Sequence, residues 1–251
     1  MRIIATLLLS AILIFGGYTA TKEVLAKRFE SQATLASGGI FSPSDHKFRC
    51  SGTEIGHAGD DGLFLTARHC VANLDTNEIH KYVLVSFSDN QGGPFYDAVP
   101  IYISLDDDLA LLLVRNGAKI PEVKIRDERR LRNGDSIFNV SFPAGTGKQE
   151  FHGDYMRSEF PSLSNEMFKE YPVWARSMPM NMTIAHGSSG SGVFSKELRA
   201  LIGVVVGTTE EGSYNIAMPA DRIIDFLNDL RDNTVDKFVV AHPLQDESPD
   251  F

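Results

Sequence analysis

The sequence is poor in cysteine and in basic residues. Its 251 residues include 2 cysteines and 24 Lys and Arg against 33 Asp and Glu, which gives a formal net charge of -9. Nucleic-acid binding needs a basic face, so this charge argues against nucleic acid as the main partner. The two cysteines do not form a Cys-x-x-Cys pattern, which argues against a redox dithiol and against a zinc site. We therefore expect no metal and no other cofactor.

Long apolar runs are scarce, and the clearest one stands at the N-terminus. Met1 and Arg2 make a short positive start before an uncharged stretch from Ile3 to Tyr18. This order is typical of an export signal, although the segment approaches the roughly 20 residues that span a bilayer. Residues 1–20 are therefore expected to be a signal peptide or a retained membrane anchor. In both cases the remainder is exported, secreted or periplasmic, and a disulfide is permitted there.

No internal repeat is visible, but short strand-like runs dominate from Phe48 onward. They are rich in Val, Ile and Phe, and Gly, Asp, Asn and Pro separate them. The predicted strands are Leu63–Thr66, Tyr82–Phe87, Val99–Ser104, Leu109–Val114, Ser136–Phe142, Leu201–Val206 and Tyr214–Met218. One helix is predicted near the end, where Ile223, Leu227 and Leu230 stand at helical spacing. So many short strands favour an all-β sandwich or barrel.

Three short stretches carry residues suited to nucleophilic catalysis. Leu65–Cys70 reads LTARHC, Asp108–Leu111 reads DLAL and Gly187–Gly192 reads GSSGSG. A serine hydroxyl is a weak nucleophile at neutral pH and needs an adjacent base. A histidine can be that base, and a carboxylate on its other ring nitrogen holds the required tautomer.

These stretches resemble the TAxHC, D[IL]AL and GxSG motifs of chymotrypsin-like serine proteases, in the same order. Asp108 follows His69 by 39 residues and precedes Ser189 by 81, as in compact members. The resemblance implies two six-stranded antiparallel β-barrels with a C-terminal helix and the catalytic cleft between the barrels. It identifies His69, Asp108 and Ser189 as the triad, because the DLAL register selects Asp108 over the two aspartates before it. It also implies an oxyanion hole made by the amides of Gly187 and Ser189.

The same resemblance assigns the cysteines and a substrate pocket. In the family a cysteine beside the histidine pairs with one on the preceding strand, which implies a Cys50–Cys70 disulfide; two free thiols are the alternative. The pocket residues implied are Thr183 at the base, with Ile184, Val205 and Gly207 in the walls. Since these four are uncharged, we expect uncharged side chains of small or medium size at the cleaved bond.

The sequence departs from the family at several positions. Ser188 stands where digestive members have an Asp that pairs with a new N-terminal ammonium, so the chain looks like the constitutively folded bacterial or viral branch. Ser141 replaces a usual Gly in a stretch, Gly134–Pro143, that is similar to the strand opening the second barrel. No PDZ-like sequence follows the predicted helix.

The expected organisation is a linker at 21–39, a trypsin-like peptidase domain at 40–235 and a C-terminal tail at 236–251. The expected function is a serine endopeptidase that hydrolyses peptide bonds through an acyl-enzyme intermediate, with a protein or peptide as substrate. Two alternatives remain open: a non-catalytic homologue that acts as a binding module, and a hydrolase of esters.

Overall fold

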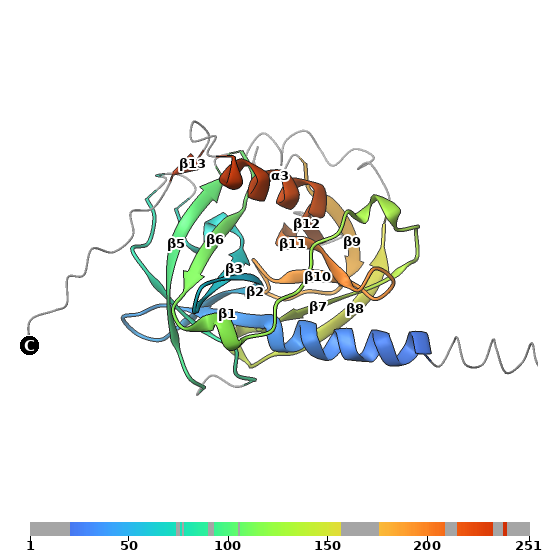
Figure 1. Cartoon of the computed structure of the whole chain (residues 1–251), viewed down its shortest axis with the longest axis horizontal. Coiled ribbons are helices and arrows are strands. Elements are labelled where there is room, and N and C mark those ends of the chain that lie inside the picture. Colours follow the sequence, from blue (N-terminus) through green and yellow to red (C-terminus); the bar gives the residue numbers. More distant parts are fainter. Residues whose placement is uncertain are drawn as a thin grey trace, which may run out of the picture.

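Two antiparallel β-barrels lie side by side in the computed structural model (Figure 1). The structure describes residues 21–73, 76, 78–89, 93–104, 106–156, 176–208, 215–232 and 238–239. The N-terminal segment 1–20 and the acidic end of the chain lie outside these residues. In the part that is described, no helix is both long and apolar enough to cross a membrane.

The first barrel is built from six strands in the order β5-β4-β1-β2-β3-β6, and pairing of β5 with β6 closes it. Its strands are β1 (Ser37–Phe41), β2 (Phe48–Ala58), β3 (Asp61–Thr66), β4 (Val83–Ser86), β5 (Tyr96–Ser104) and β6 (Ala110–Val114). A two-residue strand, β13 (Phe238–Val239), adds to the edge of β5. The prediction of a tail from 236 is therefore wrong at these two residues, which are tied to the barrel by backbone pairing.

The second barrel is closed in the order β10-β11-β12-β9-β8-β7. Its strands are β7 (Ser136–Ser141), β8 (Gln149–Tyr155), β9 (Met178–Met182), β10 (Gly192–Ser195), β11 (Ala200–Thr208) and β12 (Asn215–Pro219). Met178, Met180 and Met182 alternate along β9 and fill the interior, as the period of two in a strand requires. The predicted C-terminal helix is α3 (Ala220–Arg231), which buries Ile223 and Phe226 in the core. The all-β fold of two six-stranded barrels with a C-terminal helix is confirmed.

Residues 21–36 are helical and pack against the barrels, so the prediction of a linker at 21–39 is wrong. Phe29 makes edge contacts with Phe138 and Phe194, at ring-centroid distances of 6.0 and 6.2 Å. Ala33 and Ala36 on the same face are fully buried. The sequence of residues 22–36 is compatible with a helix, but the apolar stripe is narrow and made mostly of alanine, so the sequence does not predict that this helix packs on the barrels. The folded domain thus begins by residue 21 rather than at residue 40.

Candidate active site

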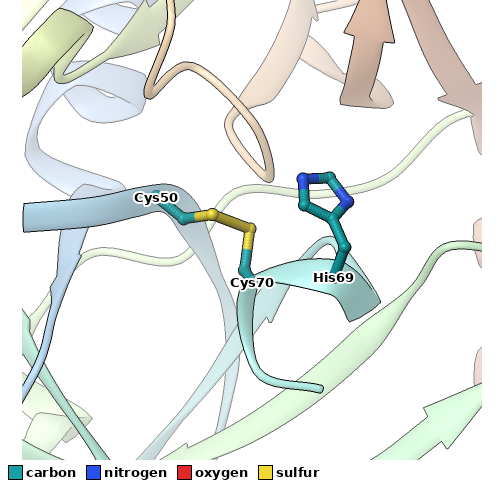
Figure 2. A group of neighbouring side chains, drawn as sticks. All are labelled: Cys50, His69 and Cys70. Atoms are coloured by element: carbon teal, nitrogen blue, oxygen red, sulfur yellow. A yellow bond between two sulfur atoms is a disulfide. The ribbon is translucent and has the colours of Figure 1, made fainter. Parts of the chain in front are cut away.

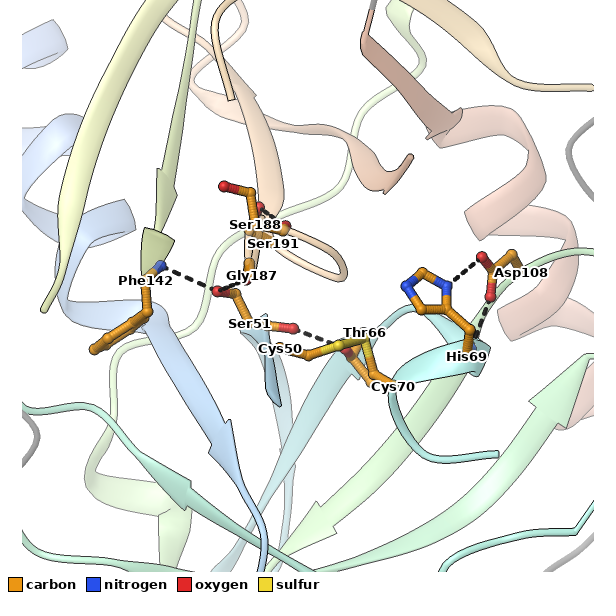
Figure 3. The surroundings of a disulfide bond; sticks show 10 residues. All are labelled: Cys50, Ser51, Thr66, His69, Cys70, Asp108, Phe142, Gly187, Ser188 and Ser191. Carbon is orange, nitrogen blue, oxygen red and sulfur yellow. Dashed lines mark hydrogen bonds and ion pairs between the residues drawn. A yellow bond between two sulfur atoms is a disulfide. The ribbon is translucent and has the colours of Figure 1, made fainter. Parts of the chain in front are cut away.

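Strand pairing in the first barrel brings His69 and Asp108 together. His69 lies in the short 3-10 helix η1 (Arg68–Cys70) after β3, and Asp108 lies just before β6. Because Thr66 of β3 is paired with Ala110 of β6, the segments that leave these strands are neighbours. His69 Nδ1 is 2.6 Å from Asp108 Oδ2, and the His69 backbone amide donates to Asp108 Oδ1 at 2.9 Å (Figure 3). Two contacts to one carboxylate fix the orientation of the imidazole.

The charges around this pair set its protonation. Burial lowers the pKa of His69, but the charge of Asp108 and its hydrogen bond together raise that pKa above the ordinary 6.5. Asp108 is completely buried, while the His69 side chain remains 24% exposed on the side away from it. With Nδ1 held by the carboxylate, Nε2 is the nitrogen left to exchange a proton with a substrate.

Of the three consecutive aspartates, Asp108 is the one that contacts His69. Asp107 is also buried, but its carboxylate forms ion pairs with Arg222 of α3 at 2.8 Å and with Arg176 at 3.2 Å. The amides of Asp106 and Asp107 both donate to Ser104 Oγ. Asp107 therefore ties the Asp108 segment to the C-terminal helix.

A disulfide joins Cys50 of β2 to Cys70, directly after His69 (Figure 2). The two Cα atoms are 5.8 Å apart, and both side chains are buried. The ligand atoms of Cys50, His69 and Cys70 lie within 4.8 Å of one another. A metal would need cysteine thiolates, and both sulfurs are consumed by the disulfide, so this group does not fit a metal ion.

Hydrogen bonds to the backbone fix the orientation of the peptides in residues 186–189. The carbonyl oxygens of four consecutive residues accept hydrogen bonds inside the protein: His186 from Ala144 N (2.6 Å), Gly187 from Ser51 Oγ (3.0 Å), Ser188 from Ser191 N (3.0 Å) and Ser189 from Ser51 N (2.8 Å). In contrast, the amides of Gly187 and Ser189 donate to no acceptor within the described part of the chain. In a trans peptide the N–H points opposite to the preceding C=O. Carbonyls bound inward therefore turn these two amides outward.

Two glycines allow the backbone of residues 187–190 to adopt this conformation. Gly187 has φ 98° and Gly190 has φ 83°, in the region that favours glycine. A side chain at Gly190 would collide with Thr66 Oγ1 and the Ser51 carbonyl. The loop thus lies tightly on β2 and β3, and it turns toward the imidazole of His69 in Figure 3. Ser189 is half-buried, and within the described part of the chain it makes no hydrogen bond to His69.

The four predicted pocket residues differ in how far they are exposed. Thr183 is exposed, Ile184 is half-buried and Gly207 is partly exposed. Val205 is fully buried and packs inside the second barrel with Ile202 and Ala217, so it faces the core. Whether Thr183 forms the base of a substrate pocket is not tested by these positions, and that assignment stays a prediction.

The sequence analysis does not identify two buried side chains at the site, Arg68 and Ser51. Arg68 lies beside the His69–Asp108 pair: burial lowers the pKa of its guanidinium, and the charge of Asp108 raises it. It donates to the Ser104 carbonyl at 3.4 Å. Ser51 contacts the Ser189 loop through both its hydroxyl and its amide. In the sequence Arg68 is next to His69 and Ser51 is next to Cys50, and nothing else in the sequence points to either residue.

Comparisons with known proteins agree with the fold. A family model for the trypsin-like peptidase domain matches residues 50–204. A serine protease do-like protein of Buchnera aphidicola is 31% identical over 102 residues, which cover 41% of this chain and 20% of that protein. The match thus spans about a fifth of that relative's length.

Solved structures share the fold at lower identity. A serine endoprotease from Yersinia pestis has a TM-score of 0.61 and 19% identity, over 83% of this chain and 67% of that one. The HtrA-type protease AlgW with a tripeptide has a TM-score of 0.62 and 17% identity, over 83% and 64%. An inactive serine-to-alanine mutant of a protein from M. tuberculosis H37Rv has a TM-score of 0.62 and 16% identity, over 86% and 93%. With the family model covering more than half of its residues, the chain belongs to the trypsin-like peptidase family.

Proposed function

We propose that this protein is a serine endopeptidase that uses His69, Asp108 and Ser189 as a catalytic triad. The observation that carries the proposal is the bonding of the loop around Ser188. Four carbonyls are bound inward, and the amides of Gly187 and Ser189 have no acceptor among the residues that the structure describes. Unused amides next to a histidine–carboxylate pair form a site for an oxygen that becomes negatively charged during reaction.

The proposed reaction has two steps, acylation of the serine and hydrolysis of the acyl-enzyme. Ser189 Oγ attacks the peptide carbonyl carbon while His69 Nε2 accepts the hydroxyl proton, and Asp108 stabilises the imidazolium that forms. The carbonyl oxygen becomes an oxyanion that accepts hydrogen bonds from the Gly187 and Ser189 amides. The C–N bond then breaks as the imidazolium gives its proton to the leaving amine, which leaves an acyl-enzyme. Water then attacks the acyl-enzyme while His69 accepts its proton, which releases the carboxylic acid product and regenerates Ser189.

The substrate is proposed to be a protein or peptide, and the protein is proposed to act outside the cytoplasm. Two of the similar structures are HtrA-type proteases with bound peptides, which supports peptide as the substrate class. The Cys50–Cys70 disulfide supports an oxidising compartment, because such bonds persist mainly in exported proteins. The apolar segment at residues 1–20 supports export as a signal or an anchor.

The triad is tested with Ser189→Ala, His69→Ala and Asp108→Ala in the full chain, using casein hydrolysis and labelling by a fluorophosphonate probe. Each substitution is expected to lower turnover by about 10⁴-fold or more, and the losses should not add, since the three residues act as one unit. Retention of normal hydrolysis by Ser189→Ala would refute the assignment. Control substitutions at the exposed Glu23 and Lys27 should leave both readouts unchanged.

A further inference from the structure

Buried hydroxyl groups from both barrels hold the loop that carries Ser189. We propose that Ser51 and Ser141 are positioning residues that fix the amides of Gly187 and Ser189 for binding the oxyanion. This inference rests on the proposed function of the site. Neither residue needs to touch the substrate: Ser51 acts through the Gly187 carbonyl, and Ser141 acts through the hydroxyl of Ser188.

Ser51 connects the first barrel to the loop at two points. Its Oγ donates to the Gly187 carbonyl at 3.0 Å, and its amide donates to the Ser189 carbonyl at 2.8 Å. The same Oγ accepts from the amide of Phe142, which follows β7 of the second barrel, at 3.1 Å (Figure 3). Ser51 is fully buried, so water cannot replace these contacts. Removing the hydroxyl would leave a buried carbonyl and a buried amide unpaired and release the peptide between Gly187 and Ser188.

Ser141 holds the loop from the second barrel. Its Oγ lies 2.9 Å from Ser188 Oγ, and both side chains are completely buried. Ser188 is also bonded through its backbone, because its amide donates to the Ala185 carbonyl at 3.0 Å. A neutral hydroxyl pair needs no counter-ion, whereas an unpaired carboxylate at either position would be costly at this depth. The pair therefore fixes the residue that lies between the two outward-facing amides.

A third contact defines the direction of the Ser189 amide itself. The Ser188 carbonyl accepts from both the amide and the hydroxyl of Ser191. Asn139 of β7 donates to Ser191 Oγ at 2.7 Å and so holds that hydroxyl in place. Since the Ser188 carbonyl and the Ser189 amide belong to one planar peptide, holding the first aims the second. The hydroxyls of Ser51 and Ser141 hold Gly187 and Ser188 on the N-terminal side of this peptide, and the Ser51 amide holds the Ser189 carbonyl on the other side.

A positioning role predicts a loss in the chemical step rather than in substrate binding. Deleting one oxyanion-hole donor in serine proteases costs about 10² to 10³ in kcat, and a misaligned pair of donors loses part of that effect. We expect Ser51→Ala and Ser141→Ala each to lower kcat by about tenfold or more, with KM within about twofold of the wild-type value. The pH at which activity is half-maximal should stay unchanged, because the His69–Asp108 contact is not altered.

The test uses the full chain and p-nitrophenyl acetate, whose small acyl group reports acylation independently of the substrate pocket. Ser195→Ala is the matched control: Ser195 is also fully buried in the second barrel, but its hydroxyl accepts from Leu198 and does not reach the loop. Thermal unfolding is measured for every variant. The proposal expects a loss of kcat in Ser51→Ala and Ser141→Ala that Ser195→Ala does not show at a similar change in melting temperature.

A double substitution separates the hydroxyl pair from general loosening of the core. Because Ser141 and Ser188 contact each other, Ser141→Ala with Ser188→Ala should lower kcat no more than the worse single substitution. If Ser51→Ala does not fold, this cycle decides the proposal. Acylation rates in Ser141→Ala and Ser188→Ala equal to that of Ser195→Ala would overturn it. Failure of the proposed function looks different, because Ser189→Ala would then acylate as fast as the wild-type chain.

Discussion

Glu54 is a buried carboxyl group whose replacement gives a sharp test of the electrostatics of the first barrel. It lies on β2 with no exposed surface, and neither of its oxygens makes a well-formed hydrogen bond. Burial raises its pKa from 4.5 to about 8; the Leu63 backbone amide lowers that pKa, and the charge of Glu122 raises it. The nearest base is His57, whose Nε2 is 3.9 Å from Glu54 Oε1.

The direction of the pH dependence of stability follows from which state of the chain, folded or unfolded, binds the Glu54 proton. Between pH 4.5 and about pH 8 the folded chain keeps the Glu54 proton, and the unfolded chain releases it. The folded state therefore binds more protons, and its stability falls as the pH rises. The contribution is fully present below pH 4.5 and is lost by the time the pH passes about 8. At 1.36 kcal/mol per pKa unit, the total is at most about 5 kcal/mol.

The perturbation is Glu54→Gln, which keeps the shape of the neutral side chain and cannot ionise. Urea unfolding of both chains, with the disulfide intact, is measured from pH 5 to pH 8. The wild-type free energy of unfolding should fall relative to that of Glu54→Gln by about 3–4 kcal/mol over this range. The raised pKa of His69 acts equally in both chains and cancels in the difference. Glu23→Gln, which replaces an exposed carboxyl, serves as the control, and a Glu54→Gln difference constant to within about 0.5 kcal/mol would refute the reasoning.

Three further predictions concern the disulfide, the triad and the N-terminal helix. Replacing Cys50 and Cys70 together by Ala should lower the free energy of unfolding by about 3 kcal/mol, because the bond closes a loop of 20 residues; a urea midpoint equal to the wild-type value would contradict this. Asp108→Asn should lower the pKa of the His69 imidazole, so the rise of kcat/KM with pH should move to lower pH while its maximum drops about 10⁴-fold; an unchanged midpoint would argue against the pairing. Phe29→Ala should destabilise the chain by about 3 kcal/mol, since its ring packs on two others; thermal unfolding without a loss would mean that the helix is not docked in solution.

Local patterns in the sequence predict most of the secondary structure and point to the candidate catalytic residues. Short apolar runs bounded by Gly, Asp and Asn predict β3, β6 and β11, and the spacing of Ile223, Leu227 and Leu230 predicts α3. The strands are readable because turn residues separate the apolar runs, and the helix is readable because its burial repeats every 3.6 residues. The three motifs with His69, Asp108 and Ser189 are equally local, and their order points to one family. The proposed oxyanion amides of Gly187 and Ser189 follow from the resemblance of the third motif to that family.

Tertiary structure decided which residues far apart in the sequence come into contact. The docking of Phe29 depends on partners more than 100 residues away in the second barrel. Ser51 and Gly187 are 136 residues apart and meet only because both barrels close. The same closure buries Glu54, whose position in the sequence gives no sign of a raised pKa. Periodicity records which face of one element is buried, whereas the partner on that face is set by how the barrels close and pack, and no single segment encodes that arrangement.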